Sequence, residues 1–291
     1  MIIVRLSGGL GNQLFQYAAG RALAIRNQAQ LVVDDRVFQS DTFRRFCMPA
    51  FNAEFVLGSE FPAAREVLPP PRNRGLQFLR WRITHGRRLK FVRERSLLFD
   101  PKIPAIGPNV YLHGYWQSEQ YFCDVASAIR NDLSLRVPPS AENSTWLSEI
   151  AAANSVSIHI RRGDYVADPK ASRVHGTCSL DYYQTAAAEI AGRLPVAPTF
   201  YVFSDDPNWV QENLRLPFTV RYVTHNDDAH NYEDLRLMAA CHHHIVANSS
   251  FSWWGAWLGC NPDRTVIAPR VWFNDPSRSD QSLVPKDWLR L

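Results

Sequence analysis

The sequence of 291 residues lacks the marks of several protein classes. No apolar run reaches the roughly 18 residues that suggest a membrane-spanning helix. The chain starts with a short strand and Ser7-Gly8-Gly9, without the apolar core or cleavage site of a signal peptide. Its five cysteines lie far apart and form no Cys-x-x-Cys pair, which argues against a disulfide framework and a zinc ribbon. Together these absences favour a reducing, cytoplasmic location.

The chain has little excess of positive over negative charge, since the net charge is only +4, yet the positive charges are unevenly spread along it. The segment from Arg72 to Arg95 holds nine Arg or Lys and one acid, Glu94, so it carries +8 and the rest of the chain carries −4. One basic segment argues against general nucleic-acid binding and for a local anionic partner.

Two interpretations of residues 72–95 stay open. The first is a solvated helix with its apolar side chains packed inward, these being Leu76, Phe78, Leu79, Ile83, Leu89 and Phe91. The second is peripheral docking on an anionic membrane or on an acceptor pyrophosphate, with Trp81, Phe78 and Leu79 adding interfacial contact.

Strand and helix patterns alternate along the chain, which predicts an α/β fold. In the first half we expect strands at 2–6 and 31–33, a helix at 12–28 and an irregular stretch at 58–110. A turn-rich linker at 137–144 predicts two domains, 1–140 and 141–291. In the second half we expect strands at 156–160, 199–203 and 244–247, and helices after Ser179, after the N-cap Asp206, at 233–241 and at 253–258.

A dinucleotide fingerprint is the first candidate motif. Gly9-Leu10-Gly11 follows the first strand, and Asp34 comes about twenty residues later, as in nicotinamide enzymes. The third glycine is missing, because position 14 is Leu. The alternatives are a tight strand-to-helix turn, or a turn where Asn12 and Gln13 offer amide groups to a substrate.

A second cluster follows the strand at 156–160. His159 and Arg161 share one face of that strand, while Arg162 points to the other or lies in the turn made by Gly163. An arginine at the carboxyl end of a parallel strand is suited to bidentate capture of phosphate oxygens, and Asp164 could buttress it. The competing interpretation is a surface ion-pair network.

Further candidates follow in the same half. The segment from Asn248 to Trp254 takes a strand end through serines into a helix, which favours an anion site, although an N-cap by Ser252 explains it as well. Asp234 could accept two hydrogen bonds from guanine, although an acid in a first helical turn also answers the helix dipole. His242-His243-His244 cannot all face one ion, and Pro207 favours capping over metal binding by Asp205-Asp206.

Five blocks in order resemble the signature blocks of α-1,2-fucosyltransferases, glycosyltransferase family 11. The blocks are Ser7–Ala18, Tyr115–Phe122, His159–Val166, Phe203–Asp206 and Asn248–Leu258. The resemblance implies an α/β, GT-B-like fold of two Rossmann-like domains facing a cleft. It implies inverting transfer of L-fucose from GDP-L-fucose to the 2-hydroxyl of a terminal β-galactoside, with no metal or other cofactor. A bacterial enzyme of surface glycan synthesis is expected.

The resemblance also assigns residues. Arg161 would stabilise the charge that grows on the β-phosphate, with Ser249 and Ser250 sharing that role. The other donor-side residues would be His159, Arg162, Asp205, Asp234, Asn248 and Phe251. Gly11, Asn12 and Gln13 would close the acceptor side. The general base stays open, and Asp168, four residues after Asp164, is the candidate.

Two other functions compete with this one. A nicotinamide oxidoreductase depends on Gly9, Gly11 and Asp34. A non-enzymatic glycan-binding protein would explain the nine tryptophans, although core packing explains them equally, and it would leave the arginine and serine clusters without a purpose.

Overall fold

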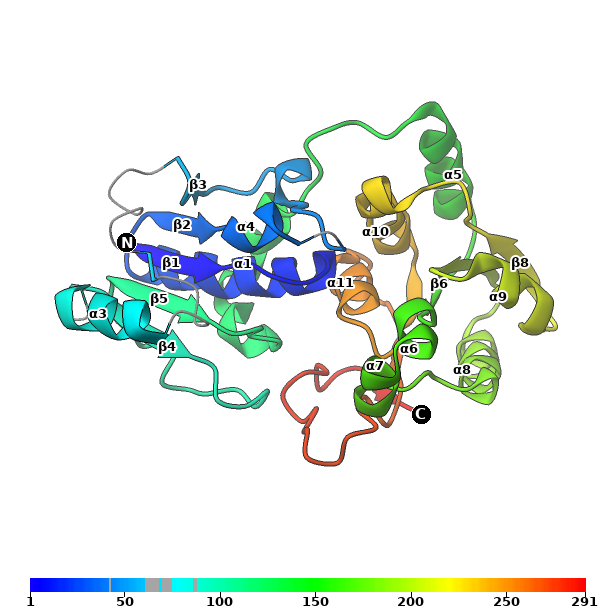
Figure 1. Ribbon diagram of the computed structural model, residues 1–291. Coiled ribbons are helices and arrows are strands. Elements are labelled where there is room, and N and C mark those ends of the chain that lie inside the picture. Colours follow the sequence, from blue (N-terminus) through cyan, green and yellow to red (C-terminus); the bar gives the residue numbers. More distant parts are fainter. Residues whose placement is uncertain (42, 61–67, 70–74, 86–87) are drawn as a thin grey trace. The chain divides into compact units, whose positions relative to one another are not determined.

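The computed structural model describes residues 1–41, 43–60, 68–69, 75–85 and 88–291. It divides the chain into two compact α/β units, Met1–Arg136 and Val137–Leu291. The dividing point lies at the start of the turn-rich segment 137–144. Each unit is built on one sheet, and every named strand pair of the two sheets is parallel (Figure 1). The predicted α/β class is confirmed.

The N-terminal sheet has the strand order β3-β2-β1-β5-β4. Its strands are β1 (Ile2–Arg5), β2 (Leu31–Asp34), β3 (Val56–Leu57), β4 (Lys90–Arg93) and β5 (Val110–His113). Helix α1 (Leu10–Arg26) packs closely on β1, because a Cβ on Gly20 would lie 2.9 Å from Cγ1 of Val4. The absent side chain at Gly20 therefore sets the distance between helix and sheet.

Two further α-helices of this unit are α3 (Gly75–His85) and α4 (Ala126–Asp132). Short 3-10 helices cover Arg36–Gln39, Met48–Ala50, Glu119–Tyr121 and Cys123–Val125. The stretch 58–110 is less irregular than expected, since it contains both α3 and β4. Its apolar residues face two opposite sides of α3, which hides a simple periodicity.

The C-terminal sheet has the strand order β11-β10-β9-β6-β7-β8. Its strands are β6 (Ser155–Ile160), β7 (Thr199–Ser204), β8 (Thr219–Tyr222), β9 (His243–Ile245), β10 (Val266–Ala268) and β11 (Leu289–Arg290). With β6 as the first strand, this is the 3-2-1-4-5-6 order of Rossmann folds. The strands β7 and β8 are therefore added on one side of β6, and β9, β10 and β11 on the other, so the strand order reverses between β6 and β9.

The helices of this unit are α5 (Ala141–Ala152), α6 (Gly163–Ala167), α7 (Pro169–Val174), α8 (Leu180–Arg193), α9 (Pro207–Asn213), α10 (Asn231–Ala240) and α11 (Ser250–Leu258), with a 3-10 turn at Asp228–His230. Asp206 caps α9 with Pro207 at N1, as predicted. Helix α11 starts earlier than expected: its cap is Ser249, whose hydroxyl accepts the Phe251 N–H, so Ser252 lies inside the helix.

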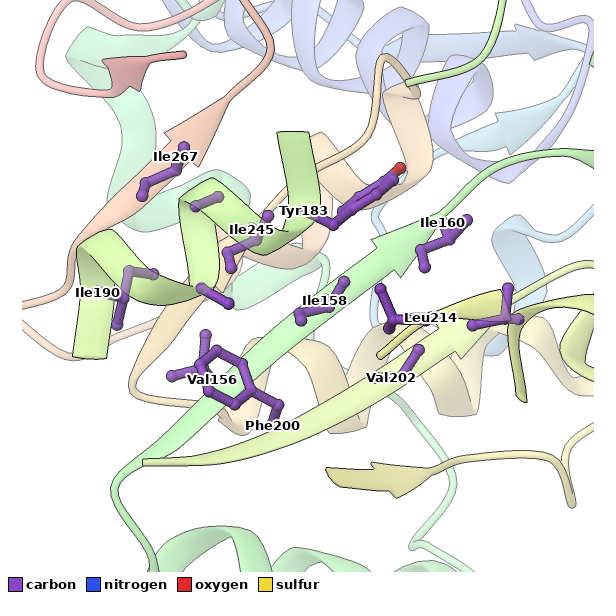
Figure 2. Close-up of a cluster of buried hydrophobic side chains, with 13 residues drawn as sticks. Val156, Ile158, Ile160, Tyr183, Ile190, Phe200, Val202, Leu214, Ile245 and Ile267 are labelled. Atoms are coloured by element: carbon purple, nitrogen blue, oxygen red, sulfur yellow. The ribbon is translucent and has the colours of Figure 1, made fainter. Parts of the chain in front are cut away.

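The core of the C-terminal unit lies between its sheet and α8. Figure 2 shows Tyr183 and Ile190 of α8 beside Val156 and Ile158 of β6 and Ile245 of β9. All five are at most 1% exposed. Each buried aliphatic or aromatic side chain contributes about 1.5–3 kcal/mol, so this contact fixes the sheet on which the candidate site is built. Among the described residues, no helix is long and apolar enough to cross a membrane.

Candidate functional site

Apart from Asp234 on α10, the predicted donor-side residues gather at the carboxyl ends of β6, β7 and β9 and in the segments that follow them. The register pairs Ile160 with Ser204, so the residues that follow, Arg161 and Asp205, leave the sheet side by side. On the other side of β6, strand β9 leads into the Asn248–Ser250 turn. Ligands of open α/β sheets bind outside the carboxyl ends at the point where the strand order reverses, which here lies between β6 and β9.

Asp205 holds the turn after β6. Its Oδ2 lies 3.1 Å from Nη1 of Arg161, and its Oδ1 accepts the Arg162 N–H at 2.9 Å. A Cβ on Gly163 would lie 2.4 Å from Oδ2 of Asp205, so only glycine leaves room for that carboxylate. Arg161 also lies over the ring of Tyr165, 5.6 Å from its centre. Asp205 therefore positions Arg161, which stays partly exposed at 23%.

Arg162 turns toward α9 instead. Its guanidinium lies over the Trp209 ring at 3.4 Å from the ring centre, and Nε lies 3.4 Å from Oδ2 of Asp206. The side chains of the two adjacent arginines thus contact different residues, as expected from the alternation of side chains along a strand. Arg161 pairs with Asp205 and stays partly exposed, and a guanidinium of this kind is suited to bidentate capture of phosphate oxygens.

His159 is buried at 4% exposure beside Phe251, with the ring centres 5.4 Å apart. The contact joins β6 to the start of α11 across the reversal point. Burial, with the nearby Arg161 charge, lowers the pKa of His159 to about 3, so the ring is neutral. Its Nδ1 is buried and has no hydrogen-bond partner among the described residues. A neutral ring with an unsatisfied nitrogen can bind a ligand but is a poor general base.

Asn248 has a structural task. Its side-chain amide donates to the carbonyls of His175, Gly176 and Trp272 at 2.9, 3.2 and 3.2 Å, which leaves it no N–H for a ligand. It ties the segment after α7 and the loop at Trp272 to the end of β9. Ser249 uses its hydroxyl as the α11 cap, and Ser250 is the first helical residue. Ser249 is thus engaged as the helix cap, and the phosphate role expected of this turn stays a prediction.

Asp234 lies in the first turn of α10, away from the Arg161 group. Burial raises its pKa to about 7, although Asn226 donates a 2.8 Å hydrogen bond to Oδ1, which acts the other way. Asn226 is itself held by Asn143, whose Nδ2 donates to its Oδ1 at 3.0 Å. A buried carboxyl with one amide donor has acceptor capacity left for a ligand.

Two acidic residues remain to be located: Asp168, the candidate base, and Asp164, the expected buttress of the arginines. Asp168 is exposed between α6 and α7, and the side chain of Asp164 lies outside the described part of the structure. The described residues contain no group of three His, Cys, Asp or Glu that could hold a metal ion. The rings of His242, His243 and His244 hydrogen-bond to Ser155, to the Thr265 N–H and to Ser157, three different places.

The N-terminal motif is largely structural. Gln13 is fully buried; its Nε2 donates to the carbonyls of Gly8 and Arg45, and its Oε1 accepts the Cys47 N–H. Both the nitrogen and the oxygen of this amide are engaged within the protein, so Gln13 holds a loop and does not present its amide to an acceptor sugar. Gly11 is buried in α1. Asn12 accepts a 2.7 Å hydrogen bond from Gln117.

Asp34 is equally committed. Arg36 donates to both of its oxygens at 2.7 and 2.8 Å, and the Tyr111 hydroxyl donates at 2.6 Å. Holding the ribose of a nicotinamide cofactor would require breaking these bonds, so the fingerprint interpretation fails on geometry. Trp116, Trp253 and Trp254 do not form a sugar platform either, because they are at most 1% exposed.

Sequence reasoning missed the residues that support the site. Tyr165 lies beside Arg161 and donates to the Asn248 carbonyl at 3.3 Å, and Asn226 holds Asp234. Tyr165 stands inside a recognised block, so its position was a usable signal. Asn226 lies in a loop without a pattern, and nothing in the sequence links it to Asp234.

The chain is similar to known glycosyltransferases. Over residues 1–291 the chain matches the model of "Glycosyl transferase family 11". It is 31% identical to "Alpha-1,2-colitosyltransferase" of Escherichia coli, over 100% of this chain and 99% of that protein. It is 31% identical to "O-antigen biosynthesis glycosyltransferase WbnK" of Escherichia coli, over 98% and 99%. It is 26% identical to human "Galactoside alpha-(1,2)-fucosyltransferase 1", over 87% and 64%.

A solved structure shows the same fold. POFUT1 in complex with GDP-fucose matches with a TM-score of 0.52 at 16% identity, covering 91% of this chain and 97% of that chain. The predicted GT-B-like architecture of two parallel-sheet units is confirmed. The family match also removes the oxidoreductase and the non-enzymatic binding protein from consideration. The chain therefore belongs to glycosyl transferase family 11.

Proposed function

We propose that the chain transfers L-fucose from GDP-L-fucose to the 2-hydroxyl of a terminal β-galactoside, forming an α-1,2 linkage with inversion. One observation carries the proposal: Arg161, held by Asp205, lies at the reversal point of the sheet near the neutral ring of His159. The α-1,2 linkage is supported by the names of two relatives, the colitosyltransferase and the human galactoside fucosyltransferase.

In this proposal the acceptor oxygen attacks C1 of fucose while the bond from C1 to the β-phosphate oxygen breaks. The electron pair leaves with GDP, so negative charge grows on the phosphate, and the acceptor proton passes to a base. Arg161 and the α11 start donate to that charge. His159 and Asp234 hold the nucleoside, and the exposed Asp168 is the candidate base. No metal ion takes part, because the guanidinium supplies the positive charge.

The biological setting is proposed on two grounds. A relative at 31% identity is named for O-antigen biosynthesis, which supports a role in bacterial surface glycans. All five cysteines are unpaired in the structure, which supports a reducing, cytoplasmic location.

The test is a transfer assay with purified protein. GDP-fucose, GDP-colitose and GDP-mannose are offered with a panel of oligosaccharides that end in β-galactose, and products are analysed by mass spectrometry and NMR. We expect fucose α-linked to the galactose 2-oxygen. GDP-colitose is included because of the colitosyltransferase relative, and colitose lacks the 3-hydroxyl that fucose carries. Exclusive use of GDP-colitose would replace the donor in this proposal, and linkage to another oxygen would overturn the regiochemistry.

A further inference from the structure

Helix α3 presents apolar side chains to solvent. Leu76, Leu79 and Ile83 are 85%, 54% and 72% exposed. Their i, i+3, i+7 spacing puts them on one face of the helix. The expectation that these three pack inward is wrong. Three large aliphatic side chains in a row on one surface form a patch of the kind that marks an interaction site.

The opposite face of α3 is firmly packed, so the exposed stripe does not come from a loose helix. The Phe78 ring lies 5.6 Å from Trp81 and 5.4 Å from Phe91, which stacks on Tyr111 at 5.4 Å. Trp81 is 6% exposed, so it belongs to the core and cannot supply the interfacial contact predicted for it. Figure 1 shows α3 beside β4 and β5 of the N-terminal sheet.

Helix α3 and strand β4 carry charged residues of one sign. Arg80 on α3, Arg88 in the following turn, and Lys90 and Arg93 on β4 are exposed. No ion pair joins any of these four to another described residue. Arg72, Arg74 and Arg87 of the basic segment lie outside the described residues.

The acid of this segment does not neutralise them. Glu94 accepts the backbone N–H groups of Tyr115 and Trp116 at 2.7 and 2.9 Å, one on each oxygen. Its carboxylate is therefore engaged in holding the loop after β5. The exposed basic side chains keep their full attraction for an anionic surface.

We propose that the α3 surface, meaning Leu76, Leu79, Arg80, Ile83 and Arg88, docks the protein peripherally on an anionic lipid bilayer. An apolar stripe flanked by arginines is the pattern of helices that lie in the membrane interface, with aliphatic groups among the acyl chains and cations at the headgroups. Because no described residue forms an ion pair with these cations, their charge favours lipid over a second protein surface: anionic headgroups are mobile and gather around each cation.

The test is flotation with vesicles of phosphatidylcholine alone or with one quarter phosphatidylglycerol, at low and high salt. We expect the wild-type protein to float with the anionic vesicles at low salt and to be largely released at high salt. The variant Arg80→Gln/Arg88→Gln should lose about fivefold in partitioning for each arginine. The variant Leu76→Ser/Leu79→Ser/Ile83→Ser should lose binding while keeping its circular dichroism spectrum, since the three side chains are exposed.

The matched control is Arg136→Gln/Val196→Ser, an exposed arginine and an exposed valine elsewhere in the chain, which should float like wild type. Transfer to a soluble acceptor should be unchanged in all variants, so failure here is distinct from failure of the enzymatic proposal. Absence of flotation at low salt, or equal flotation of the serine variant, would overturn the proposal. A dimer that the serine variant abolishes, without vesicle binding, would show that a second copy covers the stripe.

Discussion

Nη1 of Arg161 lies 3.1 Å from Oδ2 of Asp205. The pair joins the ends of two adjacent strands and holds the partly exposed guanidinium at the carboxyl edge of the sheet. An arginine that is positioned before the ligand arrives loses less freedom on binding, which favours a site organised in advance for charge that develops during reaction.

Replacing Arg161 should abolish transfer in a folded protein. Arg161→Ala removes a donor to the leaving phosphate, so we expect kcat to fall by about 100- to 1000-fold, and Arg161→Lys should recover only part because lysine lacks the fork. Steady-state kinetics checks this. Arg193→Ala, an exposed arginine paired with Glu189, is the control. Near wild-type turnover of folded Arg161→Ala would remove Arg161 from the mechanism.

Gly163→Ala should disturb the site through Asp205. The new Cβ would lie 2.4 Å from Oδ2 of Asp205, so the carboxylate must move and release Arg161. We expect lower kcat/KM, and in a double-mutant cycle with Asp205→Asn the two changes should couple by about 0.5–3 kcal/mol. Gly192→Ala is the matched control, because its Cβ would meet nothing within 4 Å. Strict additivity in the cycle would show that the glycine acts elsewhere.

Binding of GDP should depend on pH through Asp234. Its pKa near 7 means that the carboxyl is protonated below neutral pH, where it cannot accept from guanine N–H groups. Affinity should fall about tenfold per pH unit well below pH 7 and level off above it. Calorimetry from pH 5.5 to 8.5 measures this, and Asp234→Asn should give a flat profile.

The same variant also tests base selectivity. Asp234→Asn should reduce the preference for GDP over ADP, because losing a charged hydrogen bond costs about 1.5–3 kcal/mol. Unchanged selectivity would mean that another residue recognises the base.

Acid unfolding should involve His159. Its pKa is lowered to about 3 in the fold and returns to about 6.5 on unfolding, so the unfolded chain binds an extra proton between these values. Stability is therefore lost as pH falls through this window, by up to about 1.4 kcal/mol per pH unit for each such group. His159→Gln should reduce the slope of unfolding free energy against pH by about one proton. His244→Gln should do the same, since burial also lowers the pKa of His244 to about 3. Denaturant titrations at several pH values give the slopes, and an unaltered slope in both variants would contradict the burial argument.

Chelation should leave transfer largely intact. We expect activity in EDTA to stay close to that of untreated enzyme, because in the proposed mechanism Arg161 supplies the positive charge at the phosphate. An assay with and without EDTA, followed by addition of Mn²⁺ or Mg²⁺, decides the point. Complete loss that the metal restores would give Asp205 and Asp206 a metal-binding role.

The sequence predicts three adjacent strands of the C-terminal sheet, β9, β6 and β7, but not β8, β10 or β11, and it predicts the surface of the N-terminal unit poorly. Val156, Ile158 and Ile160 lie in β6 as their alternation indicates, and Asp206-Pro207 starts α9. Helix α3 has apolar residues on two faces, and periodicity cannot say whether Leu79 or Trp81 is buried, since that depends on the aromatic partners Phe91 and Tyr111.

Within the site, the arginine and histidine follow from strand position, but their partners do not. Any of three serines could cap α11, and only the path of the chain after β9 selects Ser249. The bond from Asn226 to Asp234 joins a loop to a helix, and a loop's course is not encoded by periodicity. From the sequence, Gln13 could be a substrate contact. The sequence does not show that Gln13 is buried, with its amide hydrogen-bonded within the protein.

Helices α10 and α11 touch at Gly255, where a Cβ would lie 3.0 Å from Cβ of Met238. With so little space between their backbones, the two helices shift as one piece. Asp234 near the start of α10 and Ser250 at the start of α11 therefore keep a fixed separation. In the proposed site the helix pair then selects a nucleotide by the distance between its base and its phosphate. A nucleotide in which this distance differs contacts only one of the two residues.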